Sequence, residues 1–235
     1  MSTATLNRTV GELVVERPAR ACVFERFGID YCCGGKKPLI DACIAKSVDP
    51  QHVMAGLYTI DADVDEEGTD WSTAPLTSLA DHIEATHHAY LKDELPRLDF
   101  LTEKVASRHG DHTPSLMKLR QIFVHFKAEL ESHMAKEEQV LFPIIRKLEQ
   151  GQVGFHCGSV QNPIRVMVME HEHAGEAMEQ FRELTNDYTP PPEACNTYRA
   201  LFDSLHQLEQ NMHQHVHKEN NILFPRAVKL EAGLG

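Results

Sequence analysis

The chain has 235 residues, of which 42% are hydrophobic and 25% charged, a composition typical of one large or two small globular domains. A formal net charge of −12 argues against general binding of nucleic acid or of an anionic membrane surface. No apolar run is long enough to span a bilayer, and the N-terminus lacks a signal-peptide core. The six cysteines show no disulfide-framework spacing, so we expect a protein of the reducing cytoplasm.

Residues 1–60 are predicted to form a small helical domain. Gly28 follows the apolar positions of the second helix, where a glycine commonly ends a helix. The four predicted helices begin at Thr9, Pro18, Pro38 and Pro50.

A tight turn, Asp30-Tyr-Cys-Cys-Gly-Gly, joins the second and third of these helices. Its glycines favour a sharp turn with accessible sulfurs, and the adjacent Lys36 and Lys37 would lower a thiol pKa. Adjacent cysteines do not easily bind one metal ion together, which weakens a zinc-site interpretation. Cys32 and Cys33 are therefore candidates for redox or metal-transfer chemistry, with a purely structural turn as the alternative. Cys22 and Cys43 are expected in the core.

Residues 61–74 are acidic and lack periodicity, and we predict a linker that lets the small domain swing. Long amphipathic helices follow within 75–235, joined by shorter loops. The predicted domain is an up-down-up-down four-helix bundle, which makes the chain all-α. Its helices are expected from Pro75 to Gly110, from Ser115 to Leu148, from Asn162 past Phe181, and from Glu193 past Leu223.

One phrase occurs twice in this bundle, as His-x-x-x-Glu-x-x-x-Leu-Phe-Pro. The first copy starts at His133 and Glu137, and the second at His215 and Glu219. Residues four apart lie one turn apart on one helix face. Each copy therefore directs an imidazole and a carboxylate the same way.

Both pairs take positions in the apolar stripe where leucines would be expected. A carboxylate in a bundle core is costly unless it is paired or binds a metal. The alternative without a metal is a buried histidine that is hydrogen-bonded to a neighbouring glutamate and has a purely structural role. Two copies favour a metal site over that alternative.

Each helical hairpin should supply a further histidine from its first helix. His171 precedes His215 by 44 residues, and His88 precedes His133 by 45. His87 is the alternative in the first hairpin, but His88 shares the phase of the leucines that follow. The predicted ligands are His88, His133, Glu137, His171, His215 and Glu219.

Six ligands exceed the four of a structural zinc site and suit two metal ions bridged by the two carboxylates. Imidazole and carboxylate ligands favour iron, with manganese less favoured. A near-open position on each metal would admit a small molecule such as dioxygen or nitric oxide. The ferritin-type Glu-x-x-His spacing is absent.

The remaining polar candidates are less specific. Glu129 lies one turn before His133 and Glu170 adjoins His171, so both are candidates for outer-shell or proton-relay roles. A solvated face is the stronger interpretation for Glu170. Six further histidines are expected on exposed faces or loops: His82, His109, His112, His206, His213 and His217.

The cysteine turn together with the two His-x-x-x-Glu phrases resembles the RIC family of iron–sulfur cluster repair di-iron proteins. The resemblance covers nearly the whole chain and implies a hemerythrin-like bundle with an oxo-bridged, non-haem di-iron centre. It implies that Glu137 and Glu219 bridge the irons, that Cys32 and Cys33 are the family's cysteine pair, and that Glu129 and Glu170 are its acidic channel residues. It also implies repair of clusters damaged by nitrosative or oxidative stress.

Three functions are compatible with these features. The first is a repair protein that delivers iron to damaged iron–sulfur clients or clears nitric oxide from them. The others are a nitric oxide reductase and a hemerythrin-like oxygen or iron sensor. The cysteine pair favours the first, since a sensor needs no thiols. The sequence leaves catalytic turnover open, and both a monomer and a homodimer fit.

Overall fold

The computed structural model describes residues 3–62 and 69–234. Helices are the regular elements of this part of the chain, apart from isolated bridges between Thr9 and Pro38 and between Phe155 and Gly158. The predicted all-α fold is confirmed. The linker expected at 61–74 falls in part on residues 63–68, which lie outside the described residues.

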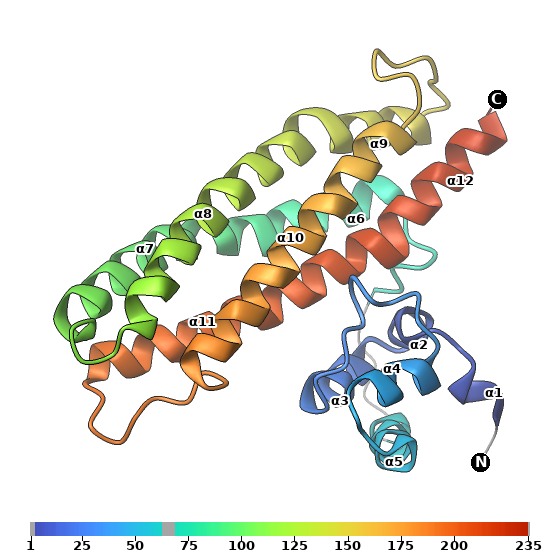
Figure 1. Ribbon diagram of the computed structural model, residues 1–235. Coiled ribbons are helices and arrows are strands. Elements are labelled where there is room, and N and C mark those ends of the chain that lie inside the picture. The colour runs from blue at the N-terminus through green and yellow to red at the C-terminus, as the bar shows by residue number, and fades with distance from the viewer. Residues whose placement is uncertain (1–2, 63–68, 235) are drawn as a thin grey trace.

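Four long helical rods form the bundle, and each runs antiparallel to the next (Figure 1). Each rod packs against its neighbour in sequence, and the fourth packs back against the first. The up-down-up-down prediction is therefore confirmed. The first rod is α6 (Leu76–Ile83), η2 (Glu84–His88) and α7 (Ala89–His109); the second is α8 (Ser115–Lys136), η3 (Glu137–Leu141) and α9 (Phe142–Glu149); the third is α10 (Gln161–Thr185); the fourth is α11 (Asn196–Lys218), η4 (Glu219–Leu223) and α12 (Phe224–Leu234).

Three rods contain a π-turn, at η2, η3 and η4. Pro143 and Pro225 come two residues after η3 and η4. A proline inside a helix lacks the N–H and crowds the carbonyl four residues earlier, and a π-turn relieves both problems without ending the rod. No proline stands close behind η2, so its π-turn lacks this local cause. The π-turns end at His88 and begin at Glu137 and Glu219.

The bundle core has two apolar clusters. One is built from α7, α8, α10 and α11, and includes Leu91, Phe123 and Phe181. The other is built mainly from α6, α9 and α12, and includes Ile83 and Phe224. On each rod, buried histidines or glutamates come between the two clusters in sequence, so a polar layer separates them.

A small helical unit lies along one side of the bundle (Figure 1). It has its own apolar core, centred on Leu13, Phe24 and Leu39. Gly28 follows α3 with φ of 63°, as a helix-ending glycine should. Its elements are α1 (Thr3–Leu6), α2 (Val10–Glu16), η1 (Pro18–Arg20), α3 (Ala21–Arg26), α4 (Leu39–Ala45) and α5 (Pro50–Ala62).

The cysteine turn is packed into the seam between this unit and the bundle. The side-chain amide of Asn221, in η4, donates hydrogen bonds to the main-chain oxygens of Tyr31 and Cys32, at 3.2 and 3.1 Å. Glycine is required at Gly11 and Gly35, because an added Cβ at either would come within 2.7 Å of the Asn221 side chain. The loop is thus fixed on the bundle.

Three expectations about exposure are wrong. Cys32 is buried rather than accessible, because the bundle covers it, while Cys33 is half-buried. Cys22, expected in the core, is exposed, whereas Cys43 is buried as expected. His217, expected on a solvated face, is buried because its ring lies against Tyr31 of the small unit.

Candidate metal centre

The polar layer brings six side chains together in the middle of the bundle. They form two groups whose ligand atoms all lie within 4.8 Å of one another. Each group takes one histidine from each hairpin, and both groups include Glu137 and Glu219. The groups are His88, Glu137, His215 and Glu219, and His133, Glu137, His171 and Glu219.

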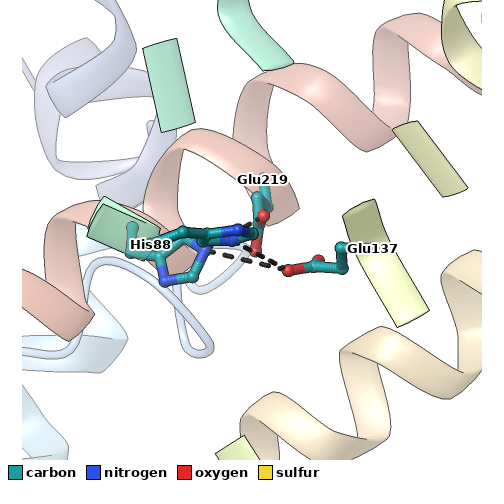
Figure 2. A group of neighbouring side chains, drawn as sticks. His88, Glu137 and Glu219 are labelled. Atoms are coloured by element: carbon teal, nitrogen blue, oxygen red, sulfur yellow. Dashed lines mark hydrogen bonds and ion pairs between the residues drawn. The ribbon is translucent and has the colours of Figure 1, made fainter. Parts of the chain in front are cut away.

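Both glutamates are fully buried and face imidazole nitrogens. Oε2 of Glu137 lies 3.3 Å from Nε2 of His88 and also 3.3 Å from Nε2 of His133. Figure 2 shows His88 and Glu137 facing each other, with Glu219 beside them. Oε2 of Glu219 lies 3.1 Å from Nε2 of His171, and its Oε1 lies 3.1 Å from Nε2 of His215.

Several of these atoms fit a metal better than they fit one another. Within the described chain, neither carboxylate oxygen of Glu137 has a hydrogen-bond partner, and the same holds for Nε2 of His88 and Oε2 of Glu219. Burying unpaired polar atoms costs free energy unless a cation compensates. The atoms form two compact groups that share Glu137 and Glu219, as two metal ions with shared carboxylates require.

Hydrogen bonds from outside the layer orient three of the histidines. Nδ1 of His88 lies 2.8 Å from Glu138, and Nδ1 of His171 lies 3.0 Å from Asn220. Nδ1 of His133 lies 2.9 Å from Glu170. Such partners fix the ring and turn Nε2 towards a metal.

The sequence analysis missed Glu138 and Asn220, although the repeat contains the signal. Each directly follows the glutamate of its phrase, and each bonds the first-helix histidine of its own hairpin. The residue after the glutamate therefore has the same role in both copies, which is to orient the first-helix histidine. Alignment of the two copies at this position is the sequence signal for that role.

Aromatic rings complete the orientation. The phenylalanine of each phrase stacks on the first-helix histidine of its hairpin: Phe142 on His88, at 5.7 Å between centroids, and Phe224 on His171, at 6.1 Å. His215 stacks on His87, at 5.4 Å. His87 itself turns away from the cluster, with Nδ1 towards Asn211.

The histidines and glutamates of the layer shift one another's pKa. Burial raises the pKa of Glu219, but His215 and His171 outweigh it and hold that pKa well below its usual range. Burial lowers the pKa of His133, but Glu137 outweighs it and raises the pKa to about 9. A metal ion would displace the proton that the raised pKa favours on His133, because ligand imidazoles bind in neutral form.

A hollow of about 340 Å³ adjoins the centre between α8 and α10. His133 and His171 form part of its wall, together with the two predicted acidic residues. Glu129 is exposed there, and Glu170 is half-buried and also pairs with Lys136. The solvated-face interpretation of Glu170 is thus wrong, since its carboxylate bonds the ring of His133.

The cysteine pair lies next to this centre but outside it. Sγ of Cys33 donates to the main-chain oxygen of His171, at 3.6 Å. Contact with Cys33, burial and the carboxylate of Asp30 raise the pKa of Cys32 well above its usual value. The lowering of a thiol pKa that Lys36 and Lys37 were expected to cause is therefore not found at Cys32.

Comparisons with known proteins cover both parts of the chain. Residues 79–227 match the family described as the hemerythrin HHE cation-binding domain, and residues 6–61 match a domain of unknown function, DUF542. The iron-sulfur cluster repair protein YtfE of Citrobacter koseri is 39% identical over 223 residues, which cover 94% of this chain and 97% of that protein. Its namesake in Shigella boydii is similar to the same extent.

Proposed function

The chain belongs to the iron-sulfur cluster repair proteins that carry a hemerythrin HHE cation-binding domain, and from this premise we propose that it returns iron to damaged iron–sulfur clusters. The observation that carries the proposal is the pair of four-ligand groups that share Glu137 and Glu219. Two metal ions held by shared carboxylates form a reservoir of iron inside the bundle. Domains at 1–60 and 75–235, joined by a linker at 61–74, are part of the proposal.

The cofactor we propose is a pair of iron ions with an oxo bridge, held by His88, His133, His171 and His215 and bridged by the two glutamates. Imidazole and carboxylate ligands suit iron, with manganese as the less favoured metal. When bound, the pair supplies ferrous or ferric iron and positions for small molecules such as dioxygen or nitric oxide. The hemerythrin-type family match supports a cation at this place.

The protein's own residues explain why iron held here could also leave. None of the six ligands is a thiolate, whereas thiolates are the ligands selected by iron–sulfur clusters, so a client offers iron a different set of donors. Glu138, Glu170 and Asn220 keep the rings in place whether or not metal is present, because they bond the outer nitrogens. Reloading the site then requires little rearrangement.

Glu129 and Glu170 line the hollow beside His133 and His171, and we assign them a role in passing cations or protons between the centre and solvent. Cys32 and Cys33 are assigned a role in the transfer itself. Clients are iron–sulfur proteins of the cytoplasm. No helix within the described ranges is long and apolar enough to cross a membrane.

The test follows labelled iron. Protein loaded with iron-57 is incubated anaerobically with a dehydratase whose cluster has been damaged by nitric oxide. We expect client activity to return and iron-57 to appear in the rebuilt cluster, while metal-free protein restores nothing. Recovery of the client without the label in its cluster would refute iron donation.

A nitric oxide reductase is the second candidate, because the hollow gives a small molecule access to His133 and His171. Anaerobic assay for nitrous oxide, with an electron donor and nitric oxide, separates the two. Turnover of nitric oxide at a rate that survives removal of the client would favour the reductase.

A further inference from the structure

A second cluster of metal-binding atoms lies in the seam between the small unit and the bundle. Asp30, Cys32 and Cys33 each offer one ligand atom, and the three atoms lie within 4.8 Å of one another. Sγ of Cys32 lies 3.1 Å from Oδ1 of Asp30. None of these three residues belongs to the bundle centre.

The spacing of these atoms decides whether a single ion fits. Metal–sulfur bonds of about 2.3 Å in a tetrahedral site place the ligand atoms about 3.8 Å apart. Atoms within 4.8 Å of one another therefore need to move by an ångström or less. The sequence argument that adjacent cysteines do not easily bind one ion does not hold for this turn, because the turn brings both sulfurs to one side and adds a carboxylate.

The turn is held in this shape from both sides. Oδ1 of Asp30 accepts the main-chain N–H of Cys32 at 2.8 Å, and its Oδ2 accepts that of Gly34 at 2.7 Å. Asn221 fixes the loop from the bundle side. A site whose ligands are ordered before the ion arrives loses less entropy on binding.

The three proposed ligands differ in their exposure to solvent, which leaves one side of the cluster open. Cys32 is buried, Cys33 is half-buried and Asp30 is exposed. An ion on these atoms would have protein on one side and solvent on the other. Three protein ligands leave a fourth tetrahedral position for water or for a ligand from another protein.

We propose that Asp30, Cys32 and Cys33 form a mononuclear site for ferrous iron, separate from the bundle centre. Binding releases the protons of the two thiols and forms two iron–sulfur bonds and one iron–oxygen bond, without change of oxidation state. Two thiolates and a carboxylate leave the ferrous complex with one net negative charge. Its open position lets a client thiolate displace one ligand at a time.

The position of the site suggests its use. Sγ of Cys33 lies 3.6 Å from the main-chain oxygen of His171, so the proposed site adjoins the helix that supplies a ligand of the bundle centre. The site would hold one iron ion at the protein surface, between the reservoir and the client. This role rests on the proposed function, whereas the existence of the site is tested without any client.

The first experiment titrates the full chain, with its bundle already loaded with iron, with cobalt(II) under anaerobic conditions. We expect one further cobalt ion per chain and a near-ultraviolet thiolate-to-cobalt absorption, which histidine and carboxylate ligands do not give. Absence of the extra equivalent, or an extra equivalent without that absorption, would overturn the site. This result needs no variant and does not depend on repair activity.

Variants then assign the ligands. Cys33→Ser should abolish the thiolate absorption or weaken binding by tenfold or more, and Asp30→Asn, which keeps an oxygen for the turn, should weaken it similarly. Cys22→Ser is the control, because Cys22 is an exposed thiol of the same small unit. Unchanged cobalt affinity in both Cys33→Ser and Asp30→Asn would refute the assignment.

A third experiment replaces cobalt(II) with ferrous iron, the metal that we propose for this site. Ferrous iron-57 is added to protein whose bundle holds iron of natural abundance, and Mössbauer spectra are recorded. A sulfur-ligated ferrous signal supports the site. A labelled signal with only nitrogen and oxygen ligands contradicts it, because the label would then lie in the bundle centre.

Discussion

The thiol of Cys33 points at the main-chain oxygen of His171, 3.6 Å away, so the small unit contacts the residue that brings an imidazole into the polar layer. The two parts of the chain are thus in contact where their chemistry is concentrated. The swinging domain inferred from the acidic linker is replaced by a docked one, held by Asn221 and by burial of Cys32.

Glu137→Ala and Glu219→Ala should each release most of the iron, because both carboxylates belong to both ligand groups. The parent should hold about two iron ions per chain. Iron analysis and Mössbauer spectroscopy measure the loss. Glu209→Ala is the matched control: Glu209 is also a buried glutamate of the fourth rod, but it pairs with Arg182, so the variant should lose stability and keep its iron. If both variants still held two iron ions, residues other than Glu137 and Glu219 would have to bridge the ions.

His88→Ala should lower the iron content to about one ion per chain, because only one of the two groups contains His88. His87→Ala should keep both ions. This substitution removes a buried ring that is hydrogen-bonded to Asn211 and Lys218, so the free energy of unfolding should fall by about 1–3 kcal/mol. Iron analysis and urea unfolding of the two variants separate these effects. The reverse pattern of iron loss would make His87 the ligand.

Changing Cys32 and Cys33 together to serine should leave the bundle iron nearly intact, because all six proposed ligands lie beyond residue 80. Repair of a nitric-oxide-damaged dehydratase should fall sharply. Client activity and iron content are measured on the same preparation. Repair at the parent rate would make the pair a structural turn only, and loss of bundle iron would show that the pair supports the centre directly.

Gly35→Ala should open the seam between the small unit and the bundle. An added Cβ would lie 2.6 Å from the main-chain oxygen of Tyr31 and 2.6 Å from Oδ1 of Asn221, and the backbone cannot yield cheaply. Limited proteolysis should cut the cysteine turn at residues 30–38 faster, with iron retained. Gly175→Ala is the control: its Cβ meets nothing within 4 Å in α10, so it should stabilise the protein by about 0.5–1 kcal/mol. Equal cleavage rates for Gly35→Ala and the parent would show that the seam does not depend on this close approach.

Glu149→Gln should destabilise the protein at neutral pH by about 0.5–1 kcal/mol. Glu149 accepts the main-chain N–H groups of Leu76 and Thr77, at 2.7 and 3.0 Å, and so caps the first rod. Burial raises its pKa, but hydrogen bonds from the side chain of Thr77 and from the main chain of Thr77 and Leu76 outweigh burial and leave the pKa below its usual value. The folded protein therefore binds this proton less readily than the unfolded chain, so the stabilisation is present above about pH 4.5 and is lost as the pH falls through the lowered pKa.

Urea unfolding of the parent and of Glu149→Gln across pH 3–7 checks this dependence. The difference between the two proteins should shrink on acidification, because the parent's carboxylate becomes protonated. A difference that stays constant over the range would mean that the negative charge contributes nothing to the cap.

Much of the candidate site follows from sequence because helical periodicity is local. Spacing by four residues puts His133 with Glu137 and His215 with Glu219, and the phase of neighbouring leucines selects His88 over His87. The repeat then gives the same arrangement to both hairpins. The bundle follows from the same apolar stripes, since each must be buried against another helix.

Tertiary structure decided what depends on contacts between distant segments. Whether Cys32 is a reactive thiolate or a buried thiol depends on the bundle that covers it and on Asp30, and whether His217 is exposed depends on Tyr31. The hydrogen bonds from Glu138 to His88 and from Asn220 to His171 join residues that are 50 and 49 positions apart in the sequence. Periodicity within one helix places a side chain on a face, but only packing between helices determines what that face meets.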